Sequence, residues 1–291
     1  PYLLAPREER AAKGAEESGF YCGPGIFHDK ATGRIHVRLA PTTLSPTRHR
    51  YAGEEDPRRL PLVISPFRSV PLHVDQGMHL RFENLVIRGG GYNTVKLSFA
   101  VDVTFRYVTV FGGTYCIRAK NSGPVKLEHC GIYGGVPPWG YWSDNALQTY
   151  DGQYYDPFTQ PPEPRPNRNI ARLPTHALLV TEGYEESDVF AFPLNNRWEI
   201  AHCEFADGHD GVYLNGREMW LHHSTVTDIQ DDAIYLSNPT PGMNEAVDIS
   251  HNYIARCTSA LGAHLRGGPE GEVRVYNNLF DLRAVYERRR P

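Results

Sequence analysis

The sequence lacks the features of several common functional classes. Its 291 residues carry 30 Lys and Arg against 34 Asp and Glu, so no cationic excess points to nucleic acid. No apolar run approaches the length of a membrane-spanning helix, and we expect no membrane partner. The sequence also has no P-loop, no dinucleotide fingerprint and no Gly-x-Ser-x-Gly phrase. These absences argue against nucleotide chemistry and against a serine nucleophile.

Sulfur is scarce as well. The chain has three Met and five Cys, with no Cys-x-x-Cys pair, which argues against a zinc ribbon and a disulfide framework. In contrast, 27 Gly, 23 Pro and 17 Tyr are present. This composition is typical of a turn-rich β protein rather than a helical one.

One eight-residue pattern recurs along the chain: apolar, any, apolar, any, polar or Tyr, small or apolar, any, apolar. The alternating apolar residues at its start predict a strand with one buried face. The copies are LRFENLVI (80–87), VTFRYVTV (103–110), VKLEHCGI (125–132), WEIAHCEF (198–205), MWLHHSTV (219–226), VDISHNYI (247–254) and VRVYNNLF (273–280). Seven copies indicate a repeat architecture in which no unit buries its apolar face alone.

A second, shorter strand follows most copies, often after a Gly-rich turn. These strands are VKL (95–97), IRA (117–119), LLV (178–180), VYL (212–214), IYL (234–236) and AHL (263–265). Most consecutive copies of the long pattern lie 21–28 residues apart, which fits one coil of a parallel β-helix with coils about 4.8 Å apart. The expected fold is therefore an all-β parallel β-helix of about seven recognisable rungs.

The sixth position of the pattern carries small and amide side chains in the later copies. The column contains Leu85, Val108, Cys130, Cys203, Ser224, Asn252 and Asn278. An Asn that stacks inside the coil at a bend can satisfy backbone groups of the turn. Cys130 and Cys203 would be neighbours, and we expect two buried thiols rather than a disulfide bond.

The chain is expected to contain two parts. Residues 1–70 form an N-terminal β-rich module and linker, with a β-hairpin predicted within 23–39, and residues 71–291 form the β-helix. No capping element closes the end of the sequence, so we expect the β-helix to be truncated at its C-terminus.

A long insertion interrupts the repeats over residues 136–174. It is crowded with Pro, Tyr and Trp, including Trp139 and Trp142, and aromatic residues argue against disorder. Long loops in compact domains are usually functional or disordered. We expect the insertion to wall a binding cleft, with a contact to another protomer as the alternative.

Acidic residues gather just before two of the short strands. Asp210 and Asp232 lie 22 residues apart, and we expect them to share a column with Tyr115 and His176. The nearby polar residues are Asp207, His209, Asp228 and Asp231. Carboxylates one rung apart raise one another's pKa, as general acid–base catalysis requires. Ca2+ bound by Asp207 and Asp228, or simple turn chemistry, would also account for the cluster.

An outward-facing column is expected along the short strands. Its members are Lys96, Arg118, Leu179, Tyr213, Tyr235 and His264. Stacked Tyr213 and Tyr235 would offer flat faces to sugar rings, although Tyr is also common on β surfaces. The candidate substrate-binding residues are His176, His209, Tyr213, Tyr235, His264, Arg266, Arg118, Trp139 and Trp142.

Three histidines, His202, His223 and His251, share the fifth position of the pattern. They are expected to form a column on a different face. Three imidazoles on three rungs could bind zinc, but polar surface residues are the commoner case and the one we expect.

The repeats resemble the right-handed parallel β-helix superfamily of pectin- and polysaccharide-degrading enzymes (pectin lyase-like), over roughly residues 72–281. HDGVYL (209–214) and QDDAIYL (230–236) are similar to the Asp-Gly and Asp-Asp phrases of polygalacturonase-type glycoside hydrolases. The resemblance implies that Asp231 protonates the leaving oxygen while Asp210 and Asp232 activate water for inversion. The Gly-His-Gly and Arg-x-Lys phrases of that family are absent, so a galacturonan substrate does not follow.

We therefore predict a secreted or periplasmic glycoside hydrolase that acts on a poly- or oligosaccharide through Asp210, Asp231 and Asp232. No cofactor is required in this prediction, and no nucleic acid partner is expected.

Two alternatives remain open. A polysaccharide lyase or epimerase of the same fold would use Lys96, Arg118 or His264 as a base, with Ca2+ on the acids. A non-catalytic carbohydrate-binding β-helix would use Tyr213, Tyr235 and the aromatic insertion without chemistry.

Overall fold

The computed structural model describes seven segments of the chain. They are residues 25–29, 31–39, 54–135, 175–182, 195–238, 245–265 and 272–282. The chain divides into two compact units. One contains residues 1–63, 137–172 and 288–291, and the other contains residues 64–136 and 173–287.

The first unit contains two antiparallel strands, β1 (Gly25–Asp29) and β2 (Arg34–Arg38), and a short 3-10 helix, η1 (Pro57–Arg59). Asp29 organises the turn between the strands, because its carboxylate accepts the backbone N–H of Ala31 at 3.0 Å. The predicted N-terminal module as a whole stays a prediction, since most of residues 1–53 lie outside the described segments.

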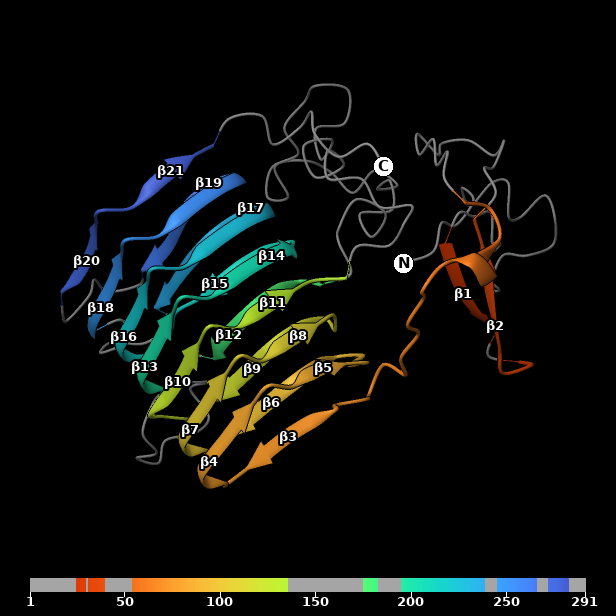
Figure 1. Cartoon of the computed structure of the whole chain (residues 1–291), viewed down its shortest axis with the longest axis horizontal. Helices are drawn as coiled ribbons and strands as arrows, with labels where there is room; N and C mark the ends of the chain where they lie inside the picture. Colours follow the sequence, from red (N-terminus) through yellow and green to blue (C-terminus); the bar gives the residue numbers. More distant parts are fainter. Residues whose placement is uncertain are drawn as a thin grey trace, which may run out of the picture. The chain divides into compact units, whose positions relative to one another are not determined.

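The second unit is built from parallel strands stacked coil upon coil (Figure 1). One sheet has seven strands: β4 (Met78–Glu83), β7 (Val101–Arg106), β10 (Val125–Glu128), β13 (Asn196–Ala201), β16 (Arg217–His222), β18 (Glu245–Ser250) and β20 (Val273–Tyr276). Every strand pairs in parallel with the strand of the next coil. Each strand coincides with the first half of one copy of the sequence pattern.

The remaining strands complete each coil. Those that follow the bend are β5 (Val86–Arg88), β8 (Thr109–Phe111), β11 (Gly131–Tyr133), β14 (Glu204–Gly208) and β21 (Leu279–Asp281). The predicted short strands are β3 (Leu72–Asp75), β6 (Asn93–Ser98), β9 (Tyr115–Lys120), β12 (Ala177–Glu182) and β15 (Asp210–Tyr213). In the two coils that precede β20 and β21, both kinds of strand merge into β17 (Thr225–Asn238) and β19 (Tyr253–Leu265).

The described part of the second unit is an all-β parallel β-solenoid of about six turns, where the sequence predicted about seven rungs. Its strands carry no α-helix between them in the described segments. Within those segments, no helix has the length and apolarity needed to cross a bilayer. The right-handed sense of the coil stays a prediction.

A left-handed residue makes the bend between the two strands of each copy. The fifth position of every copy has a φ between 51° and 58°: Asn84, Tyr107, His129, His202, His223, His251 and Asn277. Asn, Asp and His tolerate this conformation better than most other residues. The recurrent His and Asn at position five therefore have a backbone cause that the sequence pattern alone did not reveal.

Alternation along each strand separates core from surface. In β13, Trp198 and Ile200 are fully buried, whereas Arg197 is exposed and Glu199 is half-buried between them. The Trp198 indole donates a hydrogen bond to the carbonyl of Ser122 at 2.8 Å, so the polar atom of this large core residue is satisfied.

The sixth position forms a ladder of hydrogen bonds inside the coils, as predicted. The Ser224 hydroxyl accepts the backbone N–H of Cys203 at 3.0 Å, and the Asn252 amide oxygen accepts that of Ser224 at 2.9 Å. Asn252 also donates to the carbonyl of Leu221 at 2.9 Å, and Asn278 repeats the arrangement on the next coil. The ladder satisfies backbone groups that the bend would leave buried without partners.

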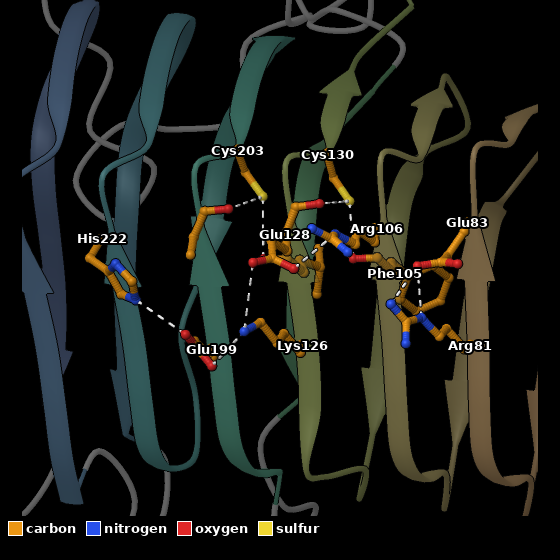
Figure 2. A network of polar contacts seen from close by, with 12 residues as sticks. Arg81, Glu83, Phe105, Arg106, Lys126, Glu128, Cys130, Glu199, Cys203 and His222 are labelled. Atoms are coloured by element: carbon orange, nitrogen blue, oxygen red, sulfur yellow. Dashed lines mark hydrogen bonds and ion pairs between the residues drawn. The ribbon is translucent and has the colours of Figure 1, made fainter.

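The cysteines of the described segments are buried free thiols, so the expectation of thiols rather than a disulfide at Cys130 and Cys203 is confirmed. Their sulfur atoms approach backbone carbonyl oxygens of the same coil and of the preceding coil (Figure 2). Burial raises the pKa of Cys257 to about 12, which suits a core residue rather than a nucleophile.

Replacing Asn252 with Ala is expected to destabilise the solenoid by about 2–6 kcal/mol. The change leaves the N–H of Ser224 and the carbonyl of Leu221 without partners, and each buried unsatisfied group costs about 1–3 kcal/mol. Urea unfolding measures the difference. The control is Asn277→Gly, at an exposed left-handed position, which is expected to change stability by less than about 0.5 kcal/mol. Equal losses in both variants would contradict the role of the ladder.

Candidate functional site

The two central carboxylates lie on adjacent coils. Val212 pairs with Ile234 and Tyr213 with Tyr235, which places Asp210 opposite Asp232, two residues earlier on each strand. A β-bulge precedes Asp232, because the register of β17 against β19 shifts between Ile229 and Asp232. Bulges often occur beside active sites, where they redirect side chains.

Two glycines fit this geometry for different reasons. A Cβ at Gly211 would lie 2.1 Å from the carbonyl oxygen of Ala233, so only glycine permits the close approach of the two coils after Asp210. A Cβ at Gly262 would lie 2.7 Å from the carboxylate of Asp232. Gly262 thus leaves room for that carboxylate on the next coil.

Asp210 is buried, with 4% of its surface exposed, in a polar environment. The Tyr213 hydroxyl donates a hydrogen bond to its Oδ2 at 2.7 Å. The Nδ1 atoms of His176 and His209 lie 3.6 and 3.7 Å from its carboxylate oxygens. Four residues that the sequence placed in one site are therefore brought together.

The register corrects one detail of the predicted corner column. Ala177, not His176, lies opposite both Tyr115 and Asp210. The ring of His176 nevertheless contacts that of Tyr115, with 5.6 Å between centroids, because it lies just before the strand.

The environment of Asp232 differs from that of Asp210. Burial raises the pKa of Asp232, a hydrogen bond from Ser259 opposes the increase, and the charge of Asp210 adds to it. Burial and the neighbouring carboxylates also raise the pKa of Tyr213 and Tyr235, so both phenols stay protonated at neutral pH. Asp231 lies in the bulge, half-buried, and its N–H donates to the carbonyl of His209 at 2.8 Å.

His176, His209 and Asp210 are also a set that could hold a metal ion. One donor atom from each lies within 4.8 Å of the others, and two imidazoles with one carboxylate suit a divalent transition metal.

Asp207 and Asp228, proposed from the sequence as Ca2+ ligands, lie on a different bend. Both have a left-handed backbone, with φ of 71° and 58°. The guanidinium of Arg256 binds both carboxylate oxygens of Asp228, at 2.8 and 2.7 Å. A Ca2+ ion at Asp228 would therefore have to compete with an ion pair that is already formed.

The stacked tyrosines lie one above the other, as the sequence predicted. The rings of Tyr213 and Tyr235 are 4.8 Å apart between centroids and tilted by 41°. Two other predicted members of this column were wrong. Leu179 is buried in the core. Val180, not Leu179, lies opposite Tyr213 on the neighbouring coil. Gly262, not His264, lies opposite Tyr235.

Basic residues continue the same face on the first coils. His73, Lys96 and Arg118 are consecutive members of the column, and Val180 links Arg118 to Tyr213. They line a cavity of about 430 Å³ together with Asp75, Lys120 and Glu182.

Arg118 is held in place within this cavity. Its guanidinium forms an ion pair with Glu182 and lies over the rings of Tyr92 and Tyr115, at 5.2 and 5.0 Å from their centroids. Tyr92, Lys120 and Glu182 could not be predicted as site residues from the sequence, because only the coil register brings them to Arg118.

Several predicted site residues lie outside the part of the chain that the structure describes. Trp139, Trp142 and Arg266 lie outside the described residues, as does the side chain of His264. Comparison with models of protein families, with curated proteins and with solved structures found no match.

Asp232→Asn is expected to make the protein more stable at neutral pH. Because the pKa of Asp232 is raised above its ordinary 3.8, the folded state holds this proton more tightly than the unfolded state, and stability falls as the carboxyl ionises. The amide of the variant does not ionise. The variant should therefore have a higher free energy of unfolding than the parent at about pH 7, and this difference should fade at about pH 3, below the ordinary pKa of Asp.

Urea unfolding of both proteins at the two pH values measures this difference. The same stability difference at both values would show that Asp232 ionises as freely in the folded chain as in the unfolded one.

Proposed function

We propose that the chain is a glycoside hydrolase that acts on a poly- or oligosaccharide, with Asp210 and Asp232 as its catalytic carboxylates. The observation that carries this proposal is the contrast between two carboxyls on adjacent coils. Asp232 has a raised pKa, whereas Asp210 accepts a hydrogen bond from Tyr213. Acid–base catalysis needs one protonated and one ionised partner, and different environments provide them.

In this mechanism Asp232 donates a proton to the leaving glycosidic oxygen. Asp210, oriented by the Tyr213 hydroxyl, accepts a proton from the attacking water. The family resemblance assigns the proton donor to Asp231 instead, and the raised pKa favours Asp232 for that role. Inversion at the anomeric carbon is the outcome that the resemblance implies.

The surface beside the carboxylates suits a sugar chain. Tyr213 and Tyr235 offer aromatic faces next to the acids, and rings of this kind stack on the apolar faces of sugars. The column continues to Lys96 and Arg118, so an extended glycan could follow the stacked coils. The pectin lyase-like resemblance and the expected secreted or periplasmic location agree with such a substrate.

A polysaccharide lyase is a second candidate, favoured by the cationic cavity. Lys96 could remove a proton next to a carboxylate that Arg118 and Lys120 hold. The two reactions differ in their products, since only elimination creates an unsaturated uronide.

The test is incubation of the protein with a panel of plant, algal and bacterial polysaccharides, read by new reducing ends and by ultraviolet absorbance. Reducing ends without absorbance are expected. Asp210→Asn and Asp232→Asn should each lower the rate at least about 100-fold, the scale of lost acid–base catalysis. Gly262→Ala should also lower it, because the added Cβ displaces the Asp232 carboxylate without removing it.

The matched control is Asp102→Asn, an exposed aspartate that pairs with His79 away from the site, which should keep full activity. Ultraviolet absorbance of the products that is lost when Lys96 is replaced would show that the reaction is elimination and not hydrolysis. Retained hydrolysis in the Asp210→Asn and Asp232→Asn variants would contradict the proposed site.

A further inference from the structure

A column of rings runs along the bend at position five, apart from the carboxylate site. Neighbouring centroids lie 5.1 Å apart for Tyr107 and His129, and 4.9 Å apart for His129 and His202. The separations are 5.2 Å for His202 and His223, and 4.9 Å for His223 and His251. All five side chains are exposed, so four imidazoles stand on one edge of the solenoid.

His222 lies beside the column, and together with His223 it forms a pair of imidazoles that could chelate a metal ion. His222 ends β16, and its Nδ1 forms a hydrogen bond of 3.0 Å with the Nδ1 of His223, so a metal ion bound by both nitrogens would displace the proton that they share. At zinc–nitrogen distances of about 2.0–2.1 Å, two ligand nitrogens of one ion lie roughly 3.0–3.4 Å apart. The two nitrogens therefore already have the spacing of a bidentate site.

The other nitrogen of His222 faces an acidic partner. Its Nε2 lies 3.7 Å from Glu199, and Lys126 holds that carboxylate from the preceding coil at 3.4 Å (Figure 2). A carboxylate behind a metal-binding imidazole orients the ring and increases its basicity as a ligand.

A third imidazole stands on the preceding coil. The ring of His202 is 5.2 Å from that of His223 and 6.3 Å from that of His222. Exposed side chains change rotamer within nanoseconds, so His202 can turn toward the pair. Three nitrogen ligands suit zinc, nickel or copper, whereas calcium and magnesium prefer oxygen.

We propose that His222 and His223 chelate a divalent transition-metal ion, with His202 as the third ligand. The ion would connect two successive coils at their bends, outside the site proposed for hydrolysis. Because the folded chain alone presents these three ligands together, binding would also raise the stability of the solenoid.

The test is calorimetric titration of the full chain with Zn2+. One tight site is expected, and His222→Gln and His223→Asn should each weaken it at least about tenfold, since each removes one of three ligands. His202→Asn should weaken it less, because this ligand must first rotate. Asn replaces His at positions 202 and 223 because it tolerates their positive φ.

The matched control is His251→Asn, one coil further on. His251 has the same left-handed backbone as His223, and its exposed imidazole is stacked on that of His223. This variant should leave Zn2+ affinity unchanged. The proposal is overturned if the double variant at 222 and 223 binds as the parent does, or if His251→Asn weakens binding equally. It is also overturned if His176→Gln alone abolishes binding, which would place the ion beside Asp210. Circular dichroism confirms that each variant is folded.

Discussion

Parallel pairing between successive coils is the constraint on which the rest of the solenoid depends. Each strand inside the stack takes its hydrogen-bond partners from the coils before and after it, so no inner coil can move without breaking ladders on both sides. The apolar positions must then face inward on every coil, since a shift by one residue would turn them outward. Residues that lie 21 to 28 positions apart in the sequence therefore become fixed neighbours.

The same constraint explains why polar residues occur in columns. Each coil must turn within one or two residues, and the left-handed bend selects His and Asn at position five. Just after that bend, Ser224 and Asn252 satisfy backbone groups inside the coil. At another corner the stacking brings Asp210 and Asp232 together, where burial raises the pKa of Asp232 and the charge of Asp210 adds to the increase.

The coils, the amide ladder and the stacking of Tyr213 on Tyr235 could be predicted because they follow from short patterns repeated in the sequence. The positions of Leu179 and His264 could not, because register depends on loop lengths and on the bulge in β17. The ion pair between Asp228 and Arg256 could not be predicted for the same reason, because these residues lie 28 positions apart in the sequence and only the register brings them together. A repeat in sequence thus identifies the fold, whereas irregularities between repeats decide which side chains meet.

The proposed site requires that coil stacking buries Asp232 beside Asp210 and so raises the pKa of Asp232. Carboxyl carbon NMR of Asp-labelled protein, titrated in the parent and in Asp210→Asn, tests it most directly. We expect Asp232 to titrate above its ordinary pKa. Removing the Asp210 charge should lower this pKa, while burial should keep it above the ordinary value. An Asp232 resonance that titrates at the ordinary value, or that ignores the substitution, would contradict the account.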